Sequence, residues 1–167
     1  DMLSLLTLNL RYHNPSDGEN SFENRIDIIR DCVSREMPDL VGFQELKNDM
    51  LEKMERIMPE YTFVGVGRDP DLGGERTSIA FRTKYFNLHS HETFWLSDTP
   101  DKPGSRFPGQ GLPRICTWAM LEYIPDRVCV VHYNTHLDHQ SADIRKLEAD
   151  IILSHMAAIK SKHDVPV

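Results

Sequence analysis

The first third of the chain alternates between two hydrophobic periods. Three short apolar runs have the length of buried strands: residues 2–10, 39–45 and 61–66. Two segments between them repeat apolar side chains every three or four positions, as amphipathic helices do: residues 22–33 and 47–58. Ser21 stands where it can cap the first of these helices. The order strand, helix, strand, helix, strand predicts a sheet with helices on its face.

The rest of the chain changes to consecutive strands and one long helix. Strands are predicted at residues 76–82, 84–96, 114–123 and 127–135, the last two forming a hairpin. Residues 97–113 are rich in glycine and proline and predict a long irregular loop, a kind of segment that is often functional. Ser141 caps a predicted helix that runs to about Ser161. Its expected inward side chains are Ile144, Leu147, Ile151, Met156 and Ile159. The pattern indicates one mixed α/β unit.

Composition narrows the class of protein. Hydrophobic residues make up 40% of the 167 residues, as in one globular domain, and no apolar run is long enough to predict a membrane span. The three cysteines, Cys32, Cys116 and Cys129, cannot all pair with one another, so we expect reduced thiols and a cytoplasmic location. The net charge of −7 disfavours nucleic acid as a partner, since long duplexes reward a basic groove. A phosphate substrate bridged by a metal stays possible, because the cation supplies local positive charge.

Polar side chains collect where predicted strands end. Asn9, Glu45 and His136 each follow or end a strand, and Glu75 stands where a glycine loop enters one. Ligands of open α/β sheets bind beyond strand ends, and carboxylate and amide oxygens are the ligands that Mg²⁺ prefers. Each residue also has an ordinary structural explanation: Asn9 as a turn cap, Glu45 as a first-turn acid of the next helix, Glu75 as a solvated carboxylate.

A zinc site is a separate hypothesis. His136-Leu137-Asp138-His139 partly matches the H-x-H-x-D-H motif of metallo-β-lactamase-like hydrolases. The first histidine of that motif falls at Asn134, which is a poor zinc ligand. We therefore rank this hypothesis below the one that follows.

Five motifs in order carry a resemblance to a known family. They are T-L-N-L-R at 7–11, D-L-V-G-F-Q-E at 39–45, G-E-R-T-S-I-A-F-R at 74–82, L-P-R-I-C-T-W-A-M-L at 112–121 and N-T-H-L-D-H at 134–139. Together they resemble the endonuclease/exonuclease/phosphatase superfamily over essentially the whole chain. The resemblance implies an α/β (α+β) fold of the deoxyribonuclease I type, a four-layered sandwich of two mixed β-sheets flanked by helices.

The resemblance also implies a divalent-metal-dependent phosphoesterase and a role for each matching residue. Glu45 matches the glutamate that binds catalytic Mg²⁺ or Mn²⁺, and Asn9 the asparagine that contacts the metal site and phosphate. His136 matches the histidine that donates to the scissile phosphate, and Glu75 the acid that orients this histidine and favours its cationic form. The substrate-binding positions it implies are Arg114, Asn134 and, less closely, Arg11.

Two motifs of the family do not occur in these 167 residues: the G-D-F-N strand and the later S-D-H triplet. We therefore expect residues 1–167 to be a single domain of this type that is incomplete at its C-terminus, and poorly active or inactive by itself. The alternative is a non-catalytic fragment that binds a phosphorylated ligand or a partner. The substrate is a nucleic acid, a nucleotide, or a sugar- or lipid-linked phosphate, as a monoester or a diester, and the oligomeric state is not predicted.

Overall fold

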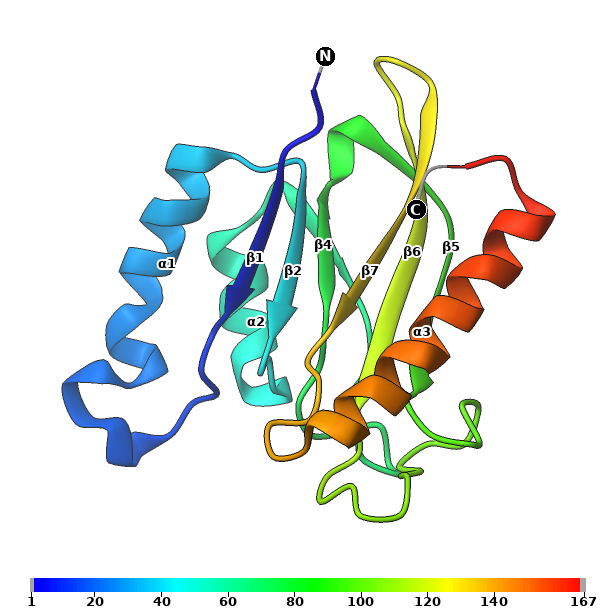
Figure 1. Ribbon diagram of the computed structural model, residues 1–167. Coiled ribbons are helices and arrows are strands. Elements are labelled where there is room, and N and C mark those ends of the chain that lie inside the picture. Colours follow the sequence, from blue (N-terminus) through cyan, green and yellow to red (C-terminus); the bar gives the residue numbers. More distant parts are fainter. Residues whose placement is uncertain (1, 166–167) are drawn as a thin grey trace.

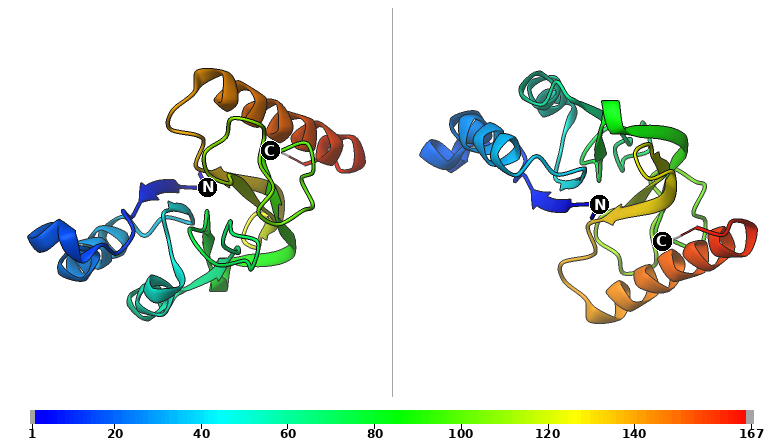
Figure 2. Two further views of the ribbon diagram at one scale, coloured as in Figure 1. Left: turned by 90° about the horizontal axis from the view of Figure 1, so that it is seen from below. Right: turned by 90° about the horizontal axis from the view of Figure 1, so that it is seen from above.

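Two β-sheets face each other, and helices cover the outer side of each (Figures 1 and 2). The computed structural model describes residues 2–165. The first sheet has the order β1 (Leu5–Asn9), β2 (Leu40–Gln44), β4 (Ile79–Arg82), β3 (Tyr61–Val64), and the second the order β5 (Phe86–Trp95), β6 (Ile115–Tyr123), β7 (Val128–Thr135). The helices are α1 (Phe22–Glu36), α2 (Asn48–Ile57) and α3 (Ala142–Lys162), with short 3-10 turns at Pro15–Asn20 and Thr83–Tyr85. This is the predicted four-layered α/β sandwich.

The strand directions decide which chain ends meet. β1 and β2 are parallel, with Asn9 opposite Gln44, whereas β4 runs antiparallel to both β2 and β3. The second sheet is antiparallel throughout and has an irregularity between Leu88 and Ser90. Because β1 and β2 are parallel and joined through α1, their C-terminal ends lie at the same edge of the first sheet.

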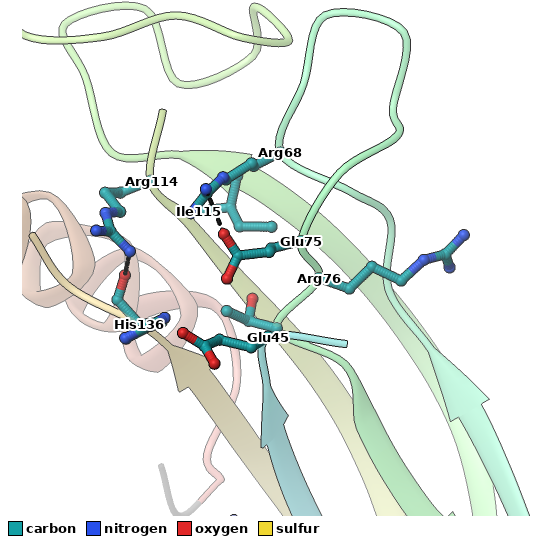
Figure 3. Close-up of a pocket in the computed structure, with 8 residues that line it drawn as sticks. Glu45, Arg68, Glu75, Arg76, Arg114, Ile115 and His136 are labelled. Carbon is teal, nitrogen blue, oxygen red and sulfur yellow. Dashed lines mark hydrogen bonds and ion pairs between the residues drawn. The ribbon is translucent and has the colours of Figure 1, made fainter. Parts of the chain in front are cut away.

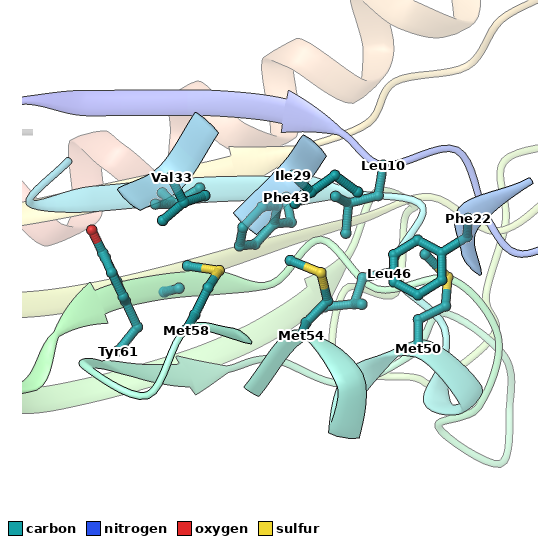
Figure 4. Close-up of a cluster of buried hydrophobic side chains, with 12 residues drawn as sticks. Leu10, Phe22, Ile29, Val33, Phe43, Leu46, Met50, Met54, Met58 and Tyr61 are labelled. Carbon is teal, nitrogen blue, oxygen red and sulfur yellow. The ribbon is translucent and has the colours of Figure 1, made fainter. Parts of the chain in front are cut away.

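Three layers of apolar side chains hold the sandwich together. Beneath α1 and α2, Met50 and Met54 of α2 pack with Phe43 of β2 (Figure 4), because residues four apart share one face of a helix. Between the sheets, Phe81 packs with Leu121. α3 covers the outer face of the second sheet. Its contacts there include Ile152 with Trp118, Met120 and Val131.

The predicted elements are confirmed with small shifts at their ends, and two predicted burial patterns are wrong. The first strand is not buried: β1 is an edge strand with β2 alone beside it, and Leu5 is 59% exposed. On α3, Leu147 is 44% exposed, and the neighbouring Glu148 is fully buried in its place. The buried stripe of α3 is Ile144, Glu148, Ile152, four residues apart.

Within residues 2–165, no helix combines the length and apolar character that crossing a bilayer requires. Cys32, Cys116 and Cys129 are free cysteines in the structure, and Cys116 is buried.

Acid should destabilise the fold through His132. This residue of β7 pairs with Ala119, whose side chain packs between the sheets. Burial lowers the pKa of His132 to about 4, so the folded protein keeps the ring neutral while the unfolded chain protonates it below about pH 6.5. The stability that the neutral ring contributes is therefore lost as pH falls from about 6.5 to 4, by about 3 kcal/mol in all.

Urea unfolding of the wild type and of His132→Leu at several pH values measures this effect. The variant should lose less stability than the wild type over that pH window, and His91→Gln, on the exposed part of β5, should match the wild type. Equal pH dependence of wild type and His132→Leu would contradict the assignment.

Candidate active site

Glu45 and Glu75 lie on neighbouring segments just beyond the C-terminal end of β2 and before the start of β4. The chain continues past β2 alongside residues 75–78: the Phe43 amide donates to the Ser78 carbonyl at 2.9 Å, and the Arg76 amide to the Leu46 carbonyl at 2.8 Å. Glu45 adopts a left-handed backbone conformation with φ of 60°. Such a conformation costs about 1 kcal/mol or more in a residue with a side chain and is typical of functional sites.

His136 comes from the other sheet, and Asn134 determines where it arrives. The buried Asn134 side chain bridges the sheets, donating to the carbonyls of Phe43 and Ser78 at 2.8 and 2.9 Å and accepting from Gln44 Nε2 at 2.8 Å. Gly42 makes room for it, since a Cβ at that position would lie 2.8 Å from Asn134 Oδ1. Because Asn134 is anchored to Gln44, His136 lies close to Glu45.

Glu45, Glu75 and His136 converge (Figure 3). One donor atom from each lies within 4.8 Å of the other two, and within residues 2–165 this is the group of His, Cys, Asp and Glu side chains that can hold a metal ion. Glu75 forms an ion pair with Arg68, and both side chains are 12% exposed. Arg76, next in the chain, points away from the cluster in Figure 3 and donates to Asn48 Oδ1 and the Gly65 carbonyl.

Arg114 adds a buried positive charge beside this group. It is 4% exposed, donates to the His136 carbonyl at 3.4 Å and lies 3.0 Å from His139 Nδ1. Burial, with a smaller effect of the Arg68 charge, lowers the pKa of Arg114, and its Nε has no partner among the described residues. A desolvated guanidinium with an unused donor is suited to bind an anion such as phosphate.

The predicted Glu75–His136 pair differs from the observed arrangement. No hydrogen bond joins the two side chains within the described part of the chain, and Glu75 pairs with Arg68. Burial and the Arg114 charge lower the pKa of His136, and they outweigh the opposite effects of Glu45 and Glu75. In this structure the neutral imidazole is favoured, contrary to the expected cation.

The group lies in a cleft of about 380 Å³ lined by Arg11, Tyr12, Glu45, Arg68, Glu75, Leu112, Arg114, His136 and His139. Arg11 is at the rim, paired with Asp17 at 2.9 Å. Asn9 ends β1 at the same edge of the sheet, and its Oδ1 accepts from the Arg11 amide at 2.8 Å, which is the turn cap considered above. Neither Asn9 nor Asn134 is among the lining residues.

For Asn134 the structure corrects the expected substrate contact. Its side chain is 5% exposed and its amide is engaged by two backbone carbonyls and Gln44, so it has no polar atom to offer a ligand. Its place in the structure is to join the two sheets beneath the cleft.

Asn134→Ala should therefore lower the free energy of unfolding by about 3 kcal/mol, since three buried hydrogen bonds between the sheets are lost at about 1 kcal/mol each. Urea denaturation measures the loss. Asn87→Ala, which removes an exposed asparagine of β5, is the matched control and should cost much less. Equal costs for the two variants would show that the bridge contributes little.

Sequence reasoning missed Arg68 and Tyr12. Arg68 follows β3, so the strand-end rule that selected Glu45 and His136 selects it as well. Tyr12 lines the cleft as well, and its ring contacts two cations, with Arg11 Cζ at 4.5 Å and Lys47 Nζ at 4.4 Å from its centroid.

The zinc hypothesis is not supported. Asp138 is buried, and its carboxylate accepts from the amides of Gln140 and Ser141, which stabilises the turn that leads into α3. Asp138 and His139 do not join His136 in the metal-competent group of the described residues. That group instead consists of two carboxylates and one imidazole, a donor set that fits a hard divalent cation.

Comparison with known proteins agrees with this architecture. No family model matches the chain. An uncharacterised protein of Acanthamoeba polyphaga mimivirus is 31% identical over 154 residues, which is 86% of this chain and 57% of that protein.

Two solved structures from Bacteroides thetaiotaomicron are similar. A mannosyl-6-phosphatase superposes with a TM-score of 0.93 at 30% identity, over 98% of this chain and 62% of that one. An endonuclease/exonuclease/phosphatase family protein gives a TM-score of 0.89 at 31% identity, over 95% and 59%. The chain thus spans roughly three fifths of the length of these proteins. In fold, and at 30–31% sequence identity, the chain is therefore similar to solved proteins of the endonuclease/exonuclease/phosphatase superfamily, as the five sequence motifs predicted.

Proposed function

We propose that this chain is part of a divalent-metal-dependent phosphoesterase. The observation that carries the proposal is the convergence of Glu45, Glu75 and His136 within 4.8 Å beside the buried cation of Arg114. Hydrolysis of a phosphoester requires that the charge on the nonbridging oxygens is neutralised and that the phosphate is held in position. Carboxylates that bind a cation supply the first, and an arginine and a histidine that donate to the phosphate supply the second.

Each side chain has a proposed role. Glu45 holds Mg²⁺ or Mn²⁺, with Asn9 contributing from the parallel neighbouring strand. The bound cation supplies charge neutralisation at the phosphate and a more acidic water. His136 donates a hydrogen bond to the phosphate from its neutral ring, and the negative charge of Glu75 raises the pKa of this imidazole against the effects of burial and Arg114.

The arginines are proposed to bind the phosphate. Arg114 offers its fork from the wall of the cleft, and Arg11 contacts the substrate at the rim. Arg68 balances the charge of Glu75.

Within this class we propose a small phosphoester, such as a sugar phosphate. A cleft of about 380 Å³ is of the size that takes small molecules, and the net charge of −7 opposes a long polyanion. The similarity to a mannosyl-6-phosphatase supports the same choice.

The test uses the complete protein that carries this chain. Hydrolysis of mannose 6-phosphate, p-nitrophenyl phosphate and bis(p-nitrophenyl) phosphate is measured with Mg²⁺, Mn²⁺, Zn²⁺ and EDTA. Turnover that needs Mg²⁺ or Mn²⁺ and is lost in EDTA is expected, with the monoesters preferred. No turnover on any ester, together with tight binding of a phosphorylated ligand, would favour the non-catalytic alternative.

A further inference from the structure

Glu148 is a buried acid in the middle of the apolar face of α3. It is fully buried, and it lies between Ile144 and Ile152 in the buried stripe of the helix. Removing a carboxylate from water is unfavourable by several kcal/mol unless hydrogen bonds compensate. Both oxygens of Glu148 are engaged: one accepts from Gln110 Nε2 at 2.5 Å, and the other from the Asp138 amide at 2.7 Å.

The first of these partners belongs to the long loop between β5 and β6. Gln110 is buried, and its Oε1 accepts from the Phe107 amide at 2.9 Å. This bond determines the orientation of the side-chain amide, so Nε2 must face Glu148. Leu112 and Arg114, which line the cleft, follow two and four residues later.

The second partner belongs to the turn between β7 and α3. Glu148 holds the Asp138 amide, and Arg145 donates to the Asp138 carbonyl at 3.0 Å. The next residue is His139, whose Nδ1 lies 3.0 Å from Arg114 Nη2. The loop before β6 and the turn before α3 are therefore connected at two places. In the interior both bind Glu148, and at the cleft Arg114 contacts His139.

We propose that Glu148 is a positioning residue that sets the wall of the cleft formed by Leu112, Arg114 and His139, and through it the affinity for the substrate. This inference rests on the proposed phosphoesterase function. The Glu45–Glu75–His136 group is held from the opposite side by Asn134, so loss of the Glu148 bonds should disturb binding and spare the chemical step.

Glu148→Gln tests this with a nearly isosteric change. Glutamine can still accept from the Asp138 amide, but its own NH₂ then faces the NH₂ of Gln110, and the bond to the loop is lost. In the complete protein we expect KM for the preferred phosphoester to rise about tenfold, the effect of one charge-assisted hydrogen bond, while kcat stays within about twofold.

The exchange Glu148→Gln with Gln110→Glu supplies a rescue. A glutamate at 110 accepts from the Phe107 amide and from the new glutamine, so donor again faces acceptor. KM should return to within about threefold of wild type. Asp150→Asn removes the same charge from the exposed face of α3 and should leave KM unchanged. If Glu148→Gln does not fold, Gln110→Leu cuts the same bond from the loop side and carries the same expectation.

A second readout separates this inference from the proposed function. The imidazole NMR signals of His139 should shift in Glu148→Gln and not in Asp150→Asn, whether or not the protein turns over an ester. Absence of turnover in the wild type would overturn the proposed function, while the NMR comparison still decides whether Glu148 positions the wall. A folded Glu148→Gln protein with unchanged KM and unchanged His139 signals, or a lower melting temperature as its sole change, would overturn the inference.

Discussion

Replacing Glu45 by glutamine is expected to lower kcat/KM of the complete protein by about 10³-fold, which corresponds to about 4 kcal/mol. The backbone of Glu45 is left-handed, and one of its carboxylate oxygens accepts a hydrogen bond from the Tyr12 amide at 3.3 Å. Glutamine keeps the size and the hydrogen bond but removes the charge that holds a divalent cation.

Two measurements identify the cause. Mn²⁺ affinity, followed by electron paramagnetic resonance, should fall together with activity, and added metal should restore part of the rate. Glu36→Gln removes an exposed carboxylate at the end of α1 and should change neither quantity. Unchanged Mn²⁺ affinity of Glu45→Gln would show that Glu45 is not a metal ligand.

His136→Gln should lower kcat by about 10²- to 10³-fold, the usual cost of removing one donor to a developing oxyanion. The imidazole lies within 4.8 Å of both Glu45 and Glu75, so geometry alone allows it to be either a phosphate donor or a metal ligand. Burial and Arg114 lower its pKa, and a neutral ring can serve in either role.

Mn²⁺ affinity distinguishes these roles. If His136 donates to the phosphate, the variant should bind Mn²⁺ as the wild type does while its kcat falls. If the imidazole is a ligand, Mn²⁺ affinity should fall as well, and the assignment made here would be wrong. His91→Gln, an exposed histidine of β5, is the matched control.

Local patterns were sufficient to predict the elements and to select the side chains that converge at the candidate site. Strand and helix periods, with the cap at Ser141, predicted nearly every element, because alternation and 3.6-residue repeats report directly which faces are buried. The strand-end rule selected Glu45 and His136 as candidates, because strand ends project side chains from the edge of a sheet, and the structure brings the two side chains together.

Features that depend on packing between sheets and loops were not predictable in this way. Asn134 lies in a strand motif and was expected to bind substrate. In the structure its side-chain amide donates instead to two backbone carbonyls of the opposite sheet. The prediction placed Leu147 on the buried face of α3, whereas the structure buries its neighbour Glu148, because the periodicity follows apolar residues and the helix buries a charged one. Its partners, Gln110 and the Asp138 amide, come from segments 38 and 10 residues away.

The element order, the resemblance to a phosphoesterase family and the polar residues at strand ends all follow from neighbours along the chain, so they could be predicted from the sequence. How the strand ends meet depends on the packing of the two sheets. The hydrogen bonds of Asn134 align the two sheets so that His136 lies close to Glu45 and Glu75. Glu75 pairs with Arg68 and not, as expected, with His136. Burial lowers the pKa of His136 and favours its neutral ring. Those outcomes depend on distance and desolvation, which arise when segments far apart in the sequence are packed together.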